Sequence, residues 1–273
     1  MPGTPAPLLI QNGWTDDLFA PEQALRIYNS VLPRNGKVTL QFGDLGHSRG
    51  ANKENEDHAF QEEGAKFFAS HLKKEGLLAT GVVTAYTQTC PSEKTIPAGG
   101  PFTANAWAKL HPHTVSFSSA AAQTFTSSGG NPEIAAGFDP IANSQACKSV
   151  KAEEEPNTAN YTMKSQGFTM MGLGTITATV EDVGTFPELV ARLWDVTPKG
   201  EQRLISRSVY RLSASQENTT STITFQLHGN GYKFPAGDTV KLQLLGRDAP
   251  YYRPSNGTFA LKATNVTVTL PTT

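Results

Sequence analysis

A chain of 273 residues is long enough for one large domain or two ordinary ones, each with a sizeable core. The formal net charge is −1, with neither a basic patch nor an acidic tail, so the composition excludes the usual footprint of nucleic-acid binding. No apolar run approaches the roughly 18 residues of a membrane-spanning helix, and the first residues lack the basic and apolar regions of a signal peptide. We therefore expect a globular protein without nucleic-acid or membrane partners.

The first 80 residues alternate between strand-like and helical patterns. Short apolar runs at 7–11 and 38–42 predict strands. Apolar residues recur at helical spacing over 21–31, where Pro21 fits the first turn, and again over 56–74. Strands that alternate with helices indicate parallel pairing in an α/β sheet. Because two strands alone cannot close such a sheet, this unit is predicted to be incomplete.

After residue 80 the helical signals vanish. Short alternating runs, from "TITATVEDV" to "ATNVTVTL", are separated by turn clusters rich in Gly, Pro and Asn. This pattern predicts an antiparallel β-sandwich with room for a jelly roll and long loops. The stretch 88–160 has little periodicity and is expected to be a loop-rich covering with a few strands. The predicted domains are residues 1–80 and 81–273.

Asp16 and His47 each come shortly after one of the two predicted strands. Catalytic groups of an open parallel sheet gather beyond the carboxyl ends of its strands, so neighbouring strands would bring both side chains to one edge. A carboxylate that holds one imidazole nitrogen orients the ring for general-base work, which predicts a separation within about 3.2 Å. The alternative interpretation is that Asp16 caps the following helix and His47 is an ordinary loop histidine.

The stretches that carry these two residues resemble the last two strand ends of an α/β-hydrolase. More narrowly, "PLLIQNGWTDDLF" and "FGDLGHSRG" are similar to the acyl esterases related to cocaine esterase and to the X-Pro dipeptidyl-peptidases, the CocE/NonD family. The family's Gly-Trp-x-Asp turn selects Asp16 over Asp17 as the acid, and its Gly-x-x-Gly/Ser-His stretch selects His47. "ELVARLWDVTPKGEQRLISRSVYRL" resembles the family's C-terminal jelly roll. The resemblance implies a partial α/β-hydrolase sheet followed by a jelly-roll sandwich.

The same resemblance implies the chemistry of the complete protein: hydrolysis of a small acyl ester or a peptide through an acyl-serine intermediate, without a cofactor or metal. In this fold the serine lies on a Gly-x-Ser-x-Gly elbow upstream of the acid, yet no serine precedes Asp16. Gly46–Gly50 matches the pattern, but Ser48 follows the acid and adjoins His47, so we reject it as the nucleophile. We predict the C-terminal portion of a serine hydrolase, inactive as this chain alone. The alternative is a non-catalytic β-sandwich binding module with a vestigial hydrolase segment.

Cys90 and Cys147 both lie in loop sequence rich in Ser, Thr and Pro. Neither belongs to a Cys-x-x-Cys pair or adjoins a histidine, so metal binding is not indicated. A disulfide is favoured over two free thiols, and we expect it to tie the loop-rich stretch onto the sandwich. Such a bond would suit an exported protein, so an extracellular or cell-surface location is expected.

Overall fold

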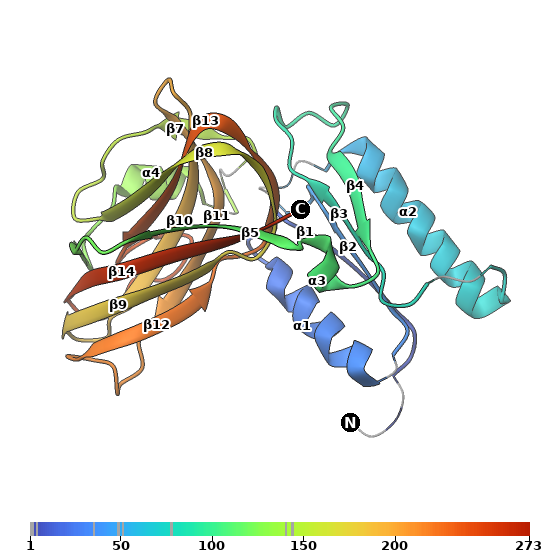
Figure 1. Ribbon diagram of the computed structural model, residues 1–273, viewed down its shortest axis with the longest axis horizontal. Helices are drawn as coiled ribbons and strands as arrows, with labels where there is room; N and C mark the ends of the chain where they lie inside the picture. Colours follow the sequence, from blue (N-terminus) through green and yellow to red (C-terminus); the bar gives the residue numbers. More distant parts are fainter. Residues whose placement is uncertain are drawn as a thin grey trace.

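The computed structural model describes residues 3, 5–34, 36–47, 50, 52–76, 79–139, 141–142 and 145–273. A small α/β unit and a large antiparallel unit lie side by side (Figure 1). Ser48, the rejected nucleophile, lies outside the described residues. Within the described ranges, no helix combines the length and apolar character needed to cross a membrane.

The α/β unit is built on a sheet whose strand order is β1-β2-β3-β4. Strands β1 (Leu8–Gly13) and β2 (Val38–Gly43) pair in parallel, which confirms the predicted pair. Strand β3 (Val83–Thr87) adds a third parallel strand, and β4 (Gly99–Ala104) returns antiparallel to it. The predicted division at residue 80 therefore cuts through this sheet. The sequence did not predict that β3 and β4 belong to this sheet. The predicted α/β pattern was an alternation of strands and helices, and β4 follows β3 through a loop.

Two helices cover opposite faces of this sheet (Figure 1). Helix α1 (Pro21–Val31) has the predicted bounds and packs its apolar side against β1 and β2. Helix α2 (Glu54–Phe68) continues as one π-helical segment (Ala69–Lys73), in agreement with the predicted second helix. The remaining short helical segments are the 3₁₀ helix Leu32–Arg34, α3 (Trp107–Leu110) and α4 (Pro132–Gly137).

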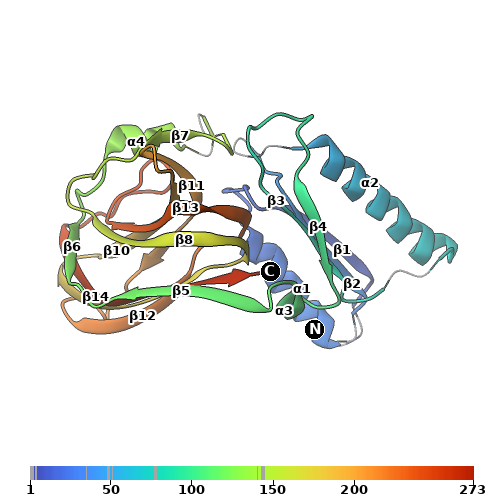
Figure 2. The same cartoon turned by 45° about the horizontal axis from the view of Figure 1, so that its top comes forward.

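The second unit is an antiparallel sheet of ten strands in the described part of the chain, with the order β12-β9-β14-β8-β13-β10-β11-β7 and with β5 and β6 paired to β14. The sheet curls so that β9, β12 and β14 face β10, β11 and β13 across an apolar core (Figure 2). The predicted large antiparallel unit is thereby confirmed. Its strands are β5 (His113–Ser119), β6 (Gln123–Thr126), β7 (Ser149–Lys151), β8 (Ala159–Gly172), β9 (Thr175–Gly184), β10 (Glu188–Val196), β11 (Glu201–Arg211), β12 (Thr220–Gln226), β13 (Asn230–Leu245) and β14 (Phe259–Thr272).

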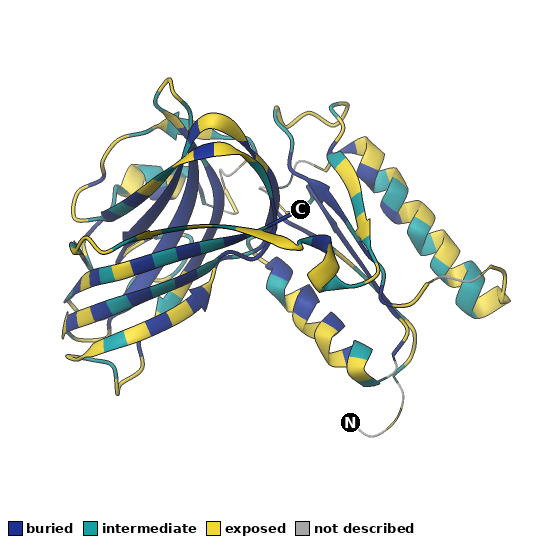
Figure 3. Ribbon diagram, viewed as in Figure 1, coloured by how far each residue is buried: buried dark blue, intermediate teal, exposed yellow. Residues whose placement is uncertain are grey.

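The two units share buried surface. Met171 and Leu173, from the end of β8 and just beyond it, pack into the core of the α/β unit with Trp14 and Phe42. The backbone N–H of Gln88, just after β3, donates to the carbonyl of Gly231 in β13 at 2.7 Å. Figure 3 shows buried residues along most strands of both units, whereas β4, β5 and the outer side of α2 are largely exposed. The units therefore pack as neighbours through both apolar and backbone contacts.

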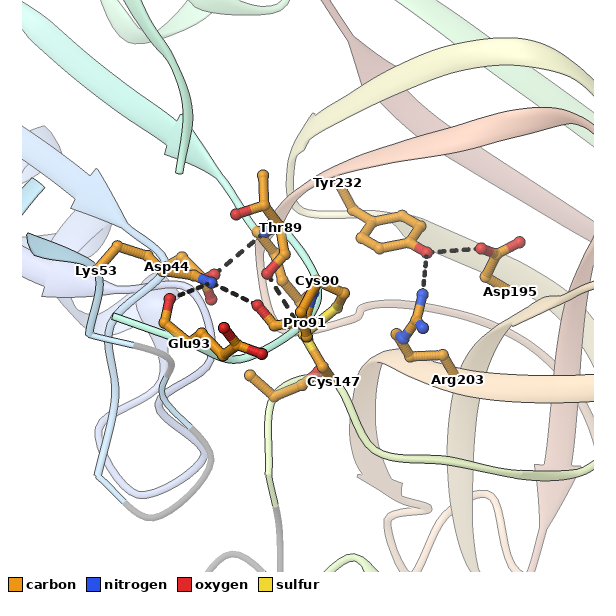
Figure 4. The surroundings of a disulfide bond; sticks show 12 residues. Asp44, Lys53, Thr89, Cys90, Pro91, Glu93, Cys147, Asp195, Arg203 and Tyr232 are labelled. Carbon is orange, nitrogen blue, oxygen red and sulfur yellow. Dashed lines mark hydrogen bonds between the residues drawn. A yellow bond between two sulfur atoms is a disulfide. The ribbon is translucent and has the colours of Figure 1, made fainter. Parts of the chain in front are cut away.

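Cys90 and Cys147 form a disulfide with a Cα–Cα distance of 5.5 Å (Figure 4). The expected bond is therefore present, but it connects different elements from those expected. Cys90 follows β3 of the α/β unit, and Cys147 precedes β7 of the antiparallel unit. The disulfide thus ties one unit to the other. The expectation differed because the sequence pattern did not predict that β3 belongs to the sheet of the first unit.

Candidate active site

Asp16 and His47 meet at the carboxyl ends of β1 and β2. His47 Nδ1 lies 2.7 Å from Asp16 Oδ2, within the predicted separation. The Asp16 side chain is 10% exposed and that of His47 is 50% exposed, so the carboxylate lies beneath an accessible imidazole. No described residue forms a hydrogen bond with Nε2 of His47. In this arrangement the carboxylate orients the ring, and the second nitrogen faces outward.

The other oxygen of Asp16 organises the turn that follows β1. Asp16 Oδ1 accepts hydrogen bonds from the backbone N–H groups of Leu18 at 3.0 Å and Phe19 at 2.9 Å. Helix α1 instead begins after Ala20, which makes no side-chain cap. The alternative that Asp16 caps this helix is therefore wrong. Oδ1 of Asp16 stabilises the turn, and Oδ2 binds the imidazole of His47.

The turns after β1 and β2 touch each other directly, which requires glycine on both sides. The carbonyl of Leu45 accepts from the backbone N–H of Thr15 at 3.2 Å and from its hydroxyl at 2.8 Å. A Cβ on Gly13 would lie 1.9 Å from that same carbonyl oxygen, and a Cβ on Gly46 would lie 2.6 Å from the carbonyl oxygen of Thr15. Backbone at this spacing admits no side chain. The two glycines thus allow the acid and the histidine to approach.

The turn that carries His47 is supported from below by Asp44 and Glu56. The backbone N–H of Asp44 donates to Glu56 Oε2 at 2.9 Å, and its carbonyl accepts from Asn52 N at 2.9 Å. The Asn52 side chain in turn accepts from the backbone N–H of Gly46 at 3.2 Å. Burial raises the pKa of the Glu56 carboxyl to about 8, although the Asp44 N–H favours its charged form. These bonds close the turn on itself around His47.

A second support comes from the loop that carries the disulfide (Figure 4). The ammonium group of the fully buried Lys53 donates to the carbonyls of Pro91 at 2.7 Å and Glu93 at 3.1 Å. The backbone N–H of Thr89 donates to Asp44 Oδ2 at 3.2 Å. Because Cys90 lies between these contacts, the disulfide and the histidine turn are parts of one connected structure.

An open cavity of about 430 Å³ lies beside the Asp16–His47 pair. Its apolar side includes the exposed ring of Phe19, whose centroid is 5.3 Å from that of His47. The polar side is formed by Gln11, Asn12, Asn52 and Asp57. Among the described residues, no three metal-ligating side chains gather here or elsewhere. The cavity therefore offers a mixed apolar and polar surface within reach of His47 Nε2.

The family model for the X-Pro dipeptidyl-peptidase C-terminal non-catalytic domain matches residues 148–270. Three solved structures share the fold of the chain: a CocE/NonD family hydrolase from Staphylococcus aureus (TM-score 0.61, 12% identity), an aminopeptidase from the marine sediment archaeon Thaumarchaeota archaeon (0.67, 12%) and an alpha-amino acid ester hydrolase (0.66, 13%). No curated protein sequence matches the chain.

These structures are aligned with nearly all of this chain, 98%, 97% and 99% respectively. The chain spans only about half of theirs, 54%, 54% and 56%. The resemblance to a C-terminal part of the CocE/NonD family is thereby confirmed at the level of the fold. The range matched by the family model begins directly after Cys147, so the disulfide stands at the amino-terminal border of that range.

Sequence reasoning missed the residues that support the pair from a distance. Arg207, within the range that the family model matches, forms a 2.6 Å ion pair with Asp17. The sequence did contain a sign that Arg207 is buried and paired. It occupies a core-facing position of the predicted strand "RLISRSVYRL", where an apolar residue is usual. Nothing in the sequence indicated that Lys53 is buried, because a lysine directly before a helix is ordinarily exposed to solvent.

Proposed function

We propose that this chain is the C-terminal portion of a serine hydrolase of the acyl esterase or X-Pro dipeptidyl-peptidase type, in which Asp16 and His47 are the acid and the base. The observation that supports this most directly is the 2.7 Å contact between them at the carboxyl ends of two parallel strands. The substrate class is a small acyl ester or a peptide, and the protein works outside the cell or at its surface. The names of two structural neighbours, an aminopeptidase and an alpha-amino acid ester hydrolase, agree with this class.

The proposed mechanism uses His47 as a proton carrier. His47 Nε2 takes the proton of a serine hydroxyl contributed from outside these 273 residues, and the serine oxygen attacks the substrate carbonyl. Asp16 stabilises the imidazolium through Nδ1. The imidazolium then protonates the departing alcohol or amine, which leaves an acyl-serine. Water, deprotonated by His47, attacks the acyl carbon, and the imidazolium returns the proton to the departing serine oxygen as the acid product is released.

The edge of the sheet also supports a larger catalytic unit. Among the described residues β1 pairs with β2 alone, so its other side offers unpaired backbone groups to another strand. Parallel sheets are ordinarily covered on both faces and extended over several strands. Leu18 and Phe19, next to the acid, are exposed apolar residues that an added segment would cover. We therefore propose that β1–β4 are the last part of an α/β-hydrolase sheet.

We assign a supporting role to the antiparallel unit, which we place in the jelly-roll class. We place its start between Ala104 and His113, where the strands change from one sheet to the other. The matched family is described as non-catalytic, and the candidate acid and base lie outside the matched range. The alternative function, a β-sandwich binding module with a vestigial hydrolase segment, shares this assignment and differs only in whether Asp16 and His47 act.

The test is to express the whole reading frame that contains this chain and to measure hydrolysis of aryl esters and of Xaa-Pro anilides. Asp16→Asn should lower kcat by roughly 10⁴-fold, and His47→Ala by at least as much. His58→Ala, at an exposed histidine on α2, is the matched control and should retain activity. A fluorophosphonate probe should label a serine outside residues 1–273. Labelling of Ser48, turnover that survives His47→Ala, or a reading frame with no such serine would overturn the proposal.

A further inference from the structure

The residue directly after the candidate acid is held by the antiparallel unit. Asp17 Oδ2 accepts from Arg207 Nη2 at 2.6 Å, across 190 positions of sequence. The Arg207 side chain is 1% exposed and that of Asp17 is 3% exposed. Removing two charges from water costs several kcal/mol each, so a buried pair of this kind is weak evidence for stability and stronger evidence for a fixed arrangement.

Arg207 has little freedom to move away from Asp17. Its guanidinium carbon lies 3.6 Å from the centroid of the Tyr251 ring, and Nη2 also donates to the carbonyl of Phe138 at 2.9 Å. Nη1 lies 3.8 Å from Asp248 Oδ2, a second buried carboxylate. A planar guanidinium stacked on an aromatic ring and bonded twice through Nη2 is a well-fixed donor. The position of Asp17 is therefore dictated by β11 and its neighbours.

The same group of side chains holds the far end of the acid turn. The hydroxyl of Tyr251 meets Nε2 of His228, and His228 Nδ1 lies 3.0 Å from Glu22 in the first turn of α1. Burial disfavours the charge on Glu22, yet the hydrogen bond and charge of His228 lower its pKa overall. The turn that carries Asp16 is thus fastened at Asp17 and at Glu22 by one connected set of residues from the antiparallel unit.

We propose that Arg207 is a positioning residue, which sets the orientation of the Asp16 carboxylate toward His47 by holding Asp17. Adjacent Cα atoms are about 3.8 Å apart and joined by a planar peptide, so a shift of Asp17 moves Asp16 with it. The inference rests on the proposed function only for its catalytic meaning. The contact between Asp16 and His47 controls the tautomer of His47 whatever the function. A carboxylate at Nδ1 keeps the proton on that nitrogen and leaves Nε2 as the acceptor.

The experiment measures the His47 tautomer by ¹⁵N NMR of the histidine-labelled 273-residue chain at a pH where the ring is neutral. We expect wild type to hold the Nδ1–H form, and Asp16→Asn to lose it. Asp17→Ala and Arg207→Gln should each raise the Nε2–H fraction at least twofold, whereas Arg207→Lys should keep part of the wild-type state. Asp182→Asn is the matched control, because it also alters a buried carboxylate, which accepts from the backbone N–H of Asn218 at 2.7 Å, and because Asp182 lies in β9, which does not pair with β11.

Each result bears on one claim. An unchanged tautomer in Asp16→Asn would overturn the proposed acid–base pair itself. A shift in Asp16→Asn, with Asp17→Ala and Arg207→Gln both like wild type, would overturn the positioning role alone, and so would an equal shift in Asp182→Asn. Should Asp17→Ala not fold, the double variant Asp17→Asn/Arg207→Gln replaces the buried pair with two neutral amides, and the same twofold rise is expected.

Discussion

The antiparallel unit and the α/β unit bury their apolar residues in different ways. The first encloses a continuous core between facing strands, with Leu193, Phe234 and Leu242 among its fully buried members. The second divides its apolar residues between the two faces of a four-stranded sheet and leaves Phe19, Phe68 and others exposed. A domain becomes independent when its layers cover each other. The antiparallel unit meets that condition within its own strands, whereas the α/β unit depends on contacts from outside.

Those outside contacts come largely from the antiparallel unit. Met171 and Leu173 complete the core around Trp14, the disulfide reaches Cys90, and Arg207 holds the acid turn. The candidate chemistry thus lies in the less self-sufficient unit, and the rigidity that it needs is supplied by its neighbour. Under the proposed function, the antiparallel unit therefore helps to set the geometry of the acid and the base although it contributes neither of them.

The comparison predicts that core substitutions in the antiparallel unit have the largest effect. Phe234 is fully buried and packs on the rings of Phe168 and Tyr232, both at 5.0 Å. Phe234→Ala should lower the free energy of unfolding by about 3–5 kcal/mol, through lost burial and the cavity left behind. Urea unfolding followed by tryptophan fluorescence measures the loss. The control is Phe186→Ala at a 49% exposed phenylalanine, which should change it by under about 1 kcal/mol. Equal losses would contradict the idea of a self-contained core.

Removal of the disulfide should weaken the α/β unit by an intermediate amount. Cys90 and Cys147 are 57 positions apart, and a loop of that size corresponds to about 2–4 kcal/mol of lost stability in the double serine variant. In this variant, amide hydrogen exchange should accelerate more in β1 and β2 than in β10 and β13, because β1 and β2 depend on the disulfide for their contact with the antiparallel unit. Reduction of the wild-type protein is the control and should reproduce the pattern. Uniformly faster exchange in both units would argue against the dependence proposed for the α/β unit.

Measured over one pH unit, the smallest predicted effect is a difference in pH dependence. Burial raises the pKa of Glu56 to about 8, so the unfolded chain ionises first as pH rises from the usual carboxyl range, and stability falls until about pH 8. The slope is at most about 1.4 kcal/mol per pH unit. In the antiparallel unit burial lowers the pKa of Lys241 to about 8, so stability falls as pH drops from the usual lysine range toward 8.

Urea titrations at several pH values test both signs with matched isosteres. Glu56→Gln should flatten the dependence below pH 8, and Lys241→Met should flatten it above pH 8. Wild-type stability that rises between the usual carboxyl range and pH 8, with Glu56→Gln unchanged, would contradict the assignment for the α/β unit.

Local patterns in the sequence were enough to predict the elements that carry the candidate pair. Pro21 and the apolar spacing after it defined α1, and two short apolar runs predicted the parallel strands β1 and β2. Their neighbouring ends then brought Asp16 and His47 to one edge, because parallel strands share a carboxyl end. The pairing of Cys90 with Cys147 was also within reach, since no other cysteine exists. The catalytic roles of Asp16 and His47 stay a prediction.

The contacts between distant segments were decided by the tertiary structure alone. The sequence placed β3 and β4 outside the first unit, because strand pairing through a long loop leaves no periodic signal. Asp17 is a surface residue by its local sequence and becomes buried only where Arg207 meets it, 190 positions away. Lys53 is likewise buried only because the carbonyls of Pro91 and Glu93 converge on it. A charge can be buried where a partner compensates its lost hydration, and such partners are brought together by the fold rather than by neighbours in the chain.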